Sequence, residues 1–216
     1  MQKLKILNLY ACLGGNRYKW DEVTNVEVTA VELDPELARL YQERFPNDTV
    51  IVADAHQYLL DHYKEFDFIW SSPPCPTHSR FNLSMKEHRT MKYPDMGLYQ
   101  EILFLDTYFK GKYVVENVIP FYEPLIPAQK RGRHLYWANF KLPADIKDRK
   151  NPDFSRLKDC VGTMSEFHDY DFHKYNGEQH KGKISRNLVD YEAGKTILEV
   201  AIGVIKNQNK NQLSLI

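Results

Sequence analysis

The sequence has few cysteines, no long apolar run and no excess of either charge, and each absence excludes a class of protein. Cys12, Cys75 and Cys160 are the only cysteines in 216 residues, and their odd number and wide spacing do not fit a disulfide framework. No apolar run is long enough to cross a bilayer, and no signal-peptide pattern precedes the first strand-like run. We therefore expect a cytoplasmic globular protein that has no membrane partner.

The charges balance overall but are unevenly distributed. Residues 1–70 hold 7 Lys and Arg against 12 Asp and Glu, whereas residues 71–216 hold 22 against 17. The basic second part favours contact with an anionic partner there. Ordinary scatter of surface charge would also produce a difference of this size.

Apolar runs and turn signals predict strands that alternate with helices. Asp34-Pro35, for example, is typical of a helix start, and the residues from Phe66 to Trp70 are typical of a buried strand. We expect strands over residues 4–10, 26–32, 49–53, 66–71, 112–116 and 132–140, and helices over 35–45, 55–64, 98–109 and 193–205. A helix is also compatible with the stretch that ends at Val23, and residues 142–185 read as irregular. This order predicts an α/β fold with a doubly wound, mostly parallel sheet.

Cys75 follows a sharp break at the end of a predicted strand. Two serines and two prolines, residues 71–74, end the strand because proline lacks an N–H and has a fixed φ. Ligands of open α/β sheets bind at the carboxyl ends of the strands. Cys75 is therefore a candidate nucleophile, although a small buried hydrophobe under a loop is the plainer interpretation of a lone cysteine.

The ends of the first three strands carry groups that suit a nucleotide. The first strand leads into Tyr10-Ala-Cys-Leu-Gly-Gly15, whose paired glycines allow close approach of a ligand to the backbone. Glu32 ends the second strand, where a ribose is usually held, and Asp54 follows the third, where a carboxylate accepts from a purine amine. Their order predicts an adenosine site, although each carboxylate alone is also a common helix cap.

Two later segments place charge beside this edge. Glu116 and Asn117 end an otherwise apolar strand, where a buried carboxylate is unusual. Arg131 and Arg133 alternate along a strand and so share one face, which suits a phosphate or a base edge. The plainer interpretations are a carboxylate that caps a helix and a solvated basic edge.

Together these segments resemble the cytosine-5 DNA methyltransferase family, in a compact form typical of phages or restriction–modification systems. Residues 10–15 are similar to its Phe-x-Gly-x-Gly-Gly cofactor loop, and Pro74-Cys75 through Ser79 to its Pro-Cys-x-x-x-Ser motif. Residues 116–118 match Glu-Asn-Val, and residues 129–133 match Gln-x-Arg-x-Arg. The resemblance covers about residues 4–140 in the family's order.

The resemblance implies a fold, a cofactor and roles for named residues. The fold would be the Rossmann-like fold of S-adenosylmethionine-dependent methyltransferases, and the partner double-stranded DNA. Cys75 would add to C6 of a flipped-out cytosine, Glu116 would hold N3 and the amino group, and Arg131 and Arg133 would bind O2 or a phosphate. The cofactor would contact Tyr10, Leu13, Gly14, Gly15, Glu32, Leu33, Asp54, Ala55 and Pro74. The DNA would contact Ser79, Arg80, Lys86, Arg89, Asn117 and Gln129, in part through a loop over residues 76–95 that closes on it.

The domains follow from the same resemblance. Residues 1–140 would form the catalytic, cofactor-binding core, residues 141–186 a reduced target-recognition region, and residues 187–216 a helix that packs back on the core with a frayed tail. Residues 187–189 are weakly similar to the family's final Gly-Asn-x-Val element, and residues 157–175 to its late conserved motif. The short second region leaves room for a separate specificity partner.

Two positions depart from the family pattern, and three further functions stay open. Cys12 replaces a glycine of the cofactor loop, and Pro76 replaces a glutamine. Residues 72–75 also resemble the motif of enzymes that methylate exocyclic amines, but a cysteine cannot stack on a base as that chemistry requires. The second open function is cytosine-5 methylation of RNA, and the third is a non-catalytic role in binding nucleic acid. Residues 168–173 alternate imidazoles and carboxylates without a second ligand pair nearby, so we expect a polar surface loop and no metal.

Overall fold

The computed structural model describes residues 3–80, 93–146, 149, 152 and 159–204. In these residues seven strands form one sheet in the order β3-β2-β1-β4-β5-β7-β6. The parallel strands are β1 (Leu4–Leu9), β2 (Val26–Glu32), β3 (Thr49–Val52), β4 (Phe68–Ser71) and β5 (Lys112–Val118). β7 (His134–Ala138) runs antiparallel to both β5 and β6 (Gln129–Arg131). The predicted α/β fold with a mostly parallel sheet is confirmed.

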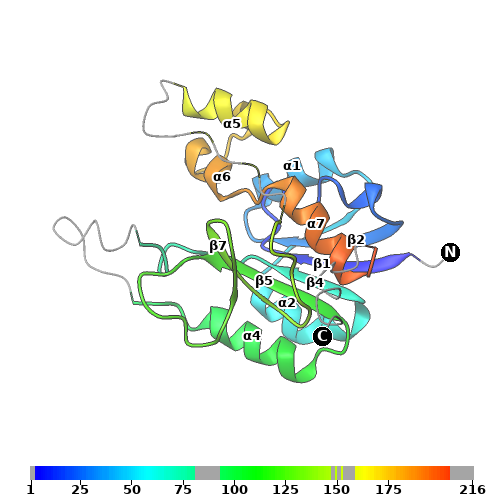
Figure 1. The fold of residues 1–216 in the computed structure, drawn as a ribbon. Helices are drawn as coiled ribbons and strands as arrows, with labels where there is room; N and C mark the ends of the chain where they lie inside the picture. The colour runs from blue at the N-terminus through cyan, green and yellow to red at the C-terminus, as the bar shows by residue number, and fades with distance from the viewer. Residues whose placement is uncertain (1–2, 81–92, 147–148, 150–151, 153–158, 205–216) are drawn as a thin grey trace, which may run out of the picture.

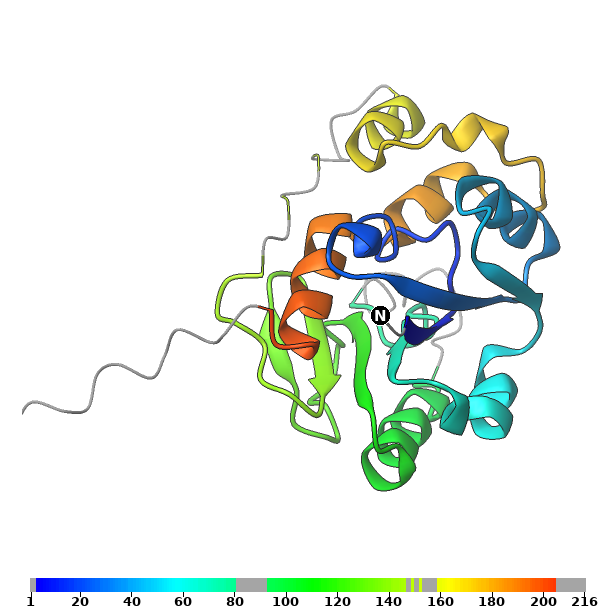
Figure 2. The same ribbon diagram turned by 90° about the vertical axis from the view of Figure 1, so that its right-hand side faces the viewer.

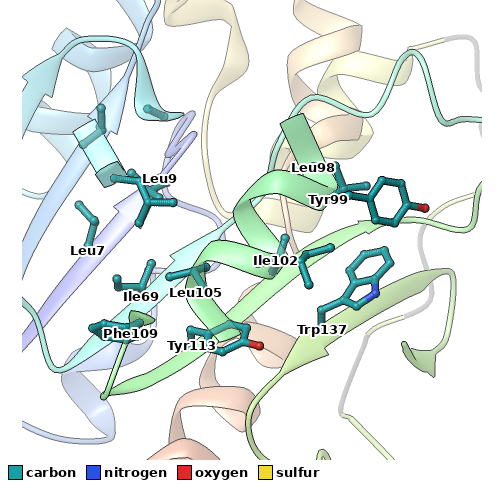
Figure 3. Close-up of a cluster of buried hydrophobic side chains, with 14 of the residues drawn as sticks. Leu7, Leu9, Ile69, Leu98, Tyr99, Ile102, Leu105, Phe109, Tyr113 and Trp137 are labelled. Atoms are coloured by element: carbon teal, nitrogen blue, oxygen red, sulfur yellow. The ribbon is translucent and has the colours of Figure 1, made fainter. Parts of the chain in front are cut away.

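Helices cover both faces of the sheet (Figures 1 and 2). Residues that alternate along the strands point to opposite faces, so each face has its own apolar core. One core joins the sheet to α2 (Ala55–His62) and α4 (Gly97–Tyr108), and Figure 3 shows part of it around Leu9, Ile69 and Ile102. The other face packs against α1 (Pro35–Arg44) and α7 (Tyr191–Ala201).

Polar caps start the helices at the edge where the parallel strands end. The Asp34 carboxylate accepts from the N–H groups of Glu36 and Leu37, and Pro35 occupies the first helical position, as the sequence predicts. Asp54 caps α2 in the same way through the N–H of Gln57. The short strand-to-helix turns therefore bring acidic side chains to the carboxyl edge of the sheet.

Three expectations about local structure are wrong. The stretch that ends at Val23 holds only a 3-10 turn, Trp20–Glu22. The predicted strand over residues 132–140 is the shorter β7, and β6 is a separate strand. Residues 142–185 are not irregular throughout, because α5 (Cys160–His168) and most of α6 (Lys181–Asn187) lie there. With 9 and 7 residues, these two helices are too short for their apolar periodicity to be read from sequence. They form by packing Met164 and Ile184 against the cluster that holds Leu13.

Among the described residues, none of the helices has the length and apolar content needed to cross a bilayer. The tail from Asn207 lies outside the described residues. Of the segment 157–175, the first two residues also lie outside them.

Candidate active site

A cavity of about 1000 Å³ opens at the carboxyl ends of the parallel strands. Its lining includes Tyr10 after β1, Glu32 at the end of β2, Asp54 after β3, Cys75 after β4, and Glu116 near the end of β5. A volume of this order suits a small-molecule ligand with room beside it. The structure thus brings the predicted adenosine site and the candidate nucleophile into one cavity.

The loop after β1 bends through left-handed backbone conformations. Cys12 has a φ of 48° and Gly14 a φ of 66°. The N–H of Cys12 donates to Oε2 of Glu32 at 2.8 Å, and the N–H of Asp34 donates to Oε1 at 2.9 Å. Each oxygen keeps a lone pair that can accept from a ribose hydroxyl. Burial raises the pKa of Glu32 above its usual range.

We expect the Cys12→Gly variant to be more stable than the Cys12→Ala variant, by about 1 kcal/mol in the free energy of unfolding. Both substitutions remove the thiol, so the comparison isolates the left-handed backbone, which only glycine adopts without strain. Urea unfolding of Cys12→Gly and Cys12→Ala measures the difference. At Leu103, an exposed position inside α4, the alanine variant should instead be more stable than the glycine variant, because glycine is unfavourable inside a helix. Equal stabilities at position 12 would mean that the loop relaxes without the glycine conformation.

The two glycines of this loop serve the protein's own packing. A Cβ on Gly14 would lie 2.4 Å from the ring of Phe45, and one on Gly15 would lie 2.2 Å from the carbonyl oxygen of Val189. Gly15 still lines the cavity, but Leu13 and Gly14 do not, since Leu13 is fully buried among apolar side chains. The missing side chain of Gly15 makes room for the chain that precedes α7, and close approach of a ligand to this loop stays a prediction.

The rest of the cofactor side combines acidic and apolar groups. Leu33 is 67% exposed beside Glu32, and Ala55 and Pro74 also line the cavity. An apolar surface flanked by the carboxylates of Glu32 and Asp54 suits a purine ring with its ribose and amino group. The residues present therefore fit an adenosyl group.

Hydrogen bonds hold the segment around the candidate nucleophile Cys75 at the end of β4. Asn117 of β5 donates to the carbonyl of Pro73 at 3.0 Å. The N–H groups of His78 and Ser79 each donate to the carbonyl of Cys75 at 3.0 Å. Cys75 is thereby fixed between two strand ends, with its half-buried thiol in the cavity wall.

The thiol of Cys75 has a raised pKa. Burial is the largest cause and the charge of Glu116 adds to it, whereas the charge of Lys183 on α6 lowers the pKa. At a given pH less thiolate is present than for an ordinary cysteine, so the free protein gains reactivity only as the solution becomes more alkaline.

We expect the rate of Cys75 alkylation by iodoacetamide to rise with pH, with a midpoint above that of an ordinary thiol. Glu116→Gln removes a negative charge and should lower the midpoint, so that alkylation at pH 8 becomes several-fold faster. Lys183→Gln removes a positive charge and should raise the midpoint. Mass spectrometry of the Cys75 peptide measures each rate, with the Cys160 peptide as the internal reference. A midpoint that neither substitution moves would contradict this electrostatic description.

Glu116 is buried on β5 and has a histidine beside it. Nε2 of His134 on β7 lies 3.5 Å from Oε1 of Glu116, and both side chains line the cavity. Glu116 and Cys75 also line the same wall, because β4 and β5 are adjacent and end at the same edge. A carboxyl group and a thiol thus face one ligand space.

The structure does not bring the two predicted arginines to this wall. The guanidinium of Arg131 donates to the carbonyls of Leu142 and Pro143, and the amide of Gln129 bonds to Phe140 and Leu142. Both side chains therefore tie β6 to the segment after β7. Arg133 is exposed and, like Arg131, does not line the cavity. Their contacts with a base or a phosphate stay predictions.

One of the residues predicted to contact DNA lines the cavity, and three others that the structure describes, Ser79, Arg80 and Gln129, do not. Asn117 lines the cavity, whereas Ser79 forms a β-bridge with Pro120 and Arg80 bonds to the Pro120 carbonyl. Lys86 and Arg89 lie outside the described residues. Within the residues described, no group of three or more His, Cys, Asp or Glu side chains is arranged to hold a metal ion.

A family model shows which family this chain belongs to. The model for C-5 cytosine-specific DNA methylase matches residues 4–119, more than half of the chain. The chain belongs to this family. Its members are S-adenosylmethionine-dependent methyltransferases, so S-adenosylmethionine is the cofactor. No curated protein matches the methylase sequence significantly.

Solved structures similar to this methylase include three methyltransferases. The Entamoeba histolytica methyltransferase EhMeth has 11% identity and a TM-score of 0.56, over 95% of this chain and 100% of its own. A mutant of DNMT2 from Spodoptera frugiperda has 26% identity and a TM-score of 0.42, over 54% and 36% of the two chains. A putative prophage DNA modification methyltransferase from E. coli has 18% identity and a TM-score of 0.40, over 56% and 34%. The methylase thus spans about a third of two of these proteins, and the likeness to EhMeth supports the fold alone.

Sequence reasoning missed several residues of the methylase site. Glu101 of α4 is buried and accepts from the hydroxyls of Tyr10 at 2.5 Å and Ser71 at 2.6 Å, so it links the cofactor loop to β4. Its signal is a carboxylate directly before the apolar run Ile102-Leu-Phe-Leu105 of α4. His78 is buried with Nδ1 at 2.6 Å from the hydroxyl of Tyr122, which anchors the nucleophile segment. The lining also contains Asn187, from the segment similar to Gly-Asn-x-Val. It further contains residues for which the sequence offers no clear signal: Gly177, Glu178, Gln179, Lys183 and Arg186.

Proposed function

We propose that this methylase transfers the methyl group of S-adenosylmethionine to C5 of cytosine in DNA through a covalent adduct at Cys75. The observation that carries the proposal is that Cys75 and Glu116 line the same cavity as the adenosyl-compatible residues Glu32 and Asp54. Methyl transfer needs donor and acceptor carbons in contact, and a shared cavity provides that proximity.

The residues support the steps of such a reaction. The target base must leave the duplex, because its ring is inaccessible in the stack. The Cys75 thiolate then forms a bond from Sγ to C6, and the electron pair displaced from the ring double bond makes C5 nucleophilic. Glu116 hydrogen-bonds to N3 and the amino group and stabilises the charge that develops on the ring. His134 lies where it can hold the Glu116 carboxyl in place.

The cofactor would be held by the groups at the ends of β1, β2 and β3. Glu32 would accept from the ribose hydroxyls, Asp54 from the purine amino group, and Leu33 and Pro74 would contact the ring. When bound, S-adenosylmethionine supplies an electrophilic methyl group. Loss of the C5 proton to a base and cleavage of the Sγ–C6 bond then restore the aromatic ring and free Cys75.

The experiment measures transfer of labelled methyl groups to unmethylated DNA of mixed sequence and, in parallel, to unmodified transfer RNA. DNA of mixed sequence presents every short target site, so the test does not depend on which sequence the methylase recognises. We expect label on DNA, with bisulfite sequencing placing it at cytosine C5. Label found only on RNA would show that the substrate is RNA and would overturn the assignment to DNA. Label on an exocyclic amine, identified by mass spectrometry of nucleosides, would overturn the cytosine-5 chemistry. Calorimetric binding of S-adenosylhomocysteine serves as the control for folded protein.

A further inference from the structure

The lysine and arginine side chains of the cavity lining come from one short helix. Acidic groups line the cavity at several points, among them Glu32, Asp54 and Glu178. Among the described residues that line the cavity, Lys183 is the one lysine and Arg186 the one arginine, and both belong to α6. The positive charge of the cavity wall is therefore concentrated at a single place.

The fold fixes this place relative to Cys75. Gly182, Ile184 and Ser185 form the buried side of α6, and Ile184 packs in the cluster that holds Leu13 of the cofactor loop. Lys183 and Arg186 are three residues apart, a spacing that puts two side chains next to each other on a helix. In both views α6 lies between α5 and the sheet (Figures 1 and 2).

Neither cation is neutralised by the residues that the structure describes. Both side chains are exposed, and neither forms a hydrogen bond or an ion pair with any residue the structure describes. The neighbouring Lys181, by contrast, donates to the carbonyl of His173 and lies outside the cavity. The charge of Lys183 lowers the pKa of the Cys75 thiol, so its ammonium group is within electrostatic reach of the nucleophile.

We propose that Lys183 and Arg186 form a phosphate-binding pair that holds the backbone of the DNA strand from which the target cytosine is extruded. This assignment rests on the proposed function. A nucleotide whose base enters the cavity brings its flanking phosphates to the cavity mouth, where acidic groups would otherwise repel them. Paired free cations on a packed helix offset that repulsion and set the position of the backbone. The pair thereby supplies the cavity with the positive charge that Arg131 and Arg133 do not bring to it.

The test measures DNA binding as a function of salt, without turnover. Fluorescence anisotropy with a labelled, unmethylated duplex and S-adenosylhomocysteine gives the dissociation constant at several KCl concentrations. Each lost phosphate contact should reduce the slope of log K against log salt by about 0.9. At 0.1 M KCl this corresponds to binding weaker by about 8-fold for Lys183→Gln or Arg186→Gln, and by about 60-fold for the double variant.

Lys181→Gln is the matched control, because it removes one charge from the same helix outside the cavity, and its slope should equal that of the wild type. Circular dichroism and binding of S-adenosylhomocysteine verify that each variant is folded. A double variant with the wild-type slope would overturn the phosphate-binding assignment, even if its turnover fell. DNA binding that weakens as expected, with no methyl on DNA, would instead support the pair and overturn the proposed reaction. A wild-type protein that binds RNA but not DNA would overturn both.

Discussion

Cys75→Ser should reduce the rate of methyl transfer by at least about 10⁴-fold while the protein still binds S-adenosylmethionine and DNA. The loss is large because the adduct at C6 is what makes C5 nucleophilic, and a serine hydroxyl is far less ionised than a thiol. The substitution changes one atom on a half-buried side chain, and the hydrogen bonds that fix the segment use the backbone carbonyl of residue 75. Single-turnover transfer of labelled methyl measures the rate.

Cys160→Ser is the matched control for this result. Cys160 begins α5 and does not line the cavity, so the same chemical change there should leave the rate within about two-fold of the wild type.

A duplex with 5-fluorocytosine adds a direct readout, since the fluorine cannot leave as the C5 proton does and the covalent adduct persists. The adduct should form with wild type and Cys160→Ser but not with Cys75→Ser. Methyl transfer that survives in Cys75→Ser would overturn the nucleophile assignment and favour amine methylation.

The sequence allowed prediction of the strand ends that build the site. Apolar runs closed by Ser-Pro-Pro or by a capping aspartate mark where β2 and β4 stop, because proline and caps act locally. Parallel strands then present their ends at one edge, and this alone brings Cys75 and Glu116 together. Local chemistry and topology suffice for these two residues.

Contacts made by long side chains were beyond such reasoning. The expectation that Arg131 and Arg133 share one strand face is wrong, because Arg131 ends β6 and Arg133 lies in the turn before β7. The guanidinium of Arg131 bonds to the carbonyls of residues 142 and 143, which only the fold brings within reach. The same holds for Lys183, whose helix is short and distant in sequence from the cavity it lines. Likewise, the backbone at Cys12 keeps the glycine conformation without the glycine, because the Glu32 carboxylate accepts its N–H.

Glu116→Gln should lower the rate of methyl transfer by about 10²- to 10³-fold, the effect expected when one group that stabilises developing charge is lost. The amide has nearly the same shape, so the variant should fold and bind DNA. A glutamine amide can donate to N3 and accept from the amino group, but it cannot transfer a proton to N3 as a protonated carboxyl group can, so it stabilises less of the charge that develops on the ring. His134 would also lose the carboxylate that lies beside it.

Glu116→Gln also distinguishes stabilisation of the charge on the ring from an effect on the pKa of the Cys75 thiol. Removing the charge of Glu116 lowers the pKa of the Cys75 thiol, so Cys75 should be alkylated faster while methyl transfer becomes slower. A carboxylate that served only to tune the thiol would instead change both rates in the same direction. Glu123→Gln, an exposed glutamate between β5 and β6, is the control and should change neither rate. If Glu116→Gln raised both rates, the only effect of Glu116 would be to raise the pKa of the Cys75 thiol. Another group of the cavity wall would then have to bind N3, with His134 as the first candidate.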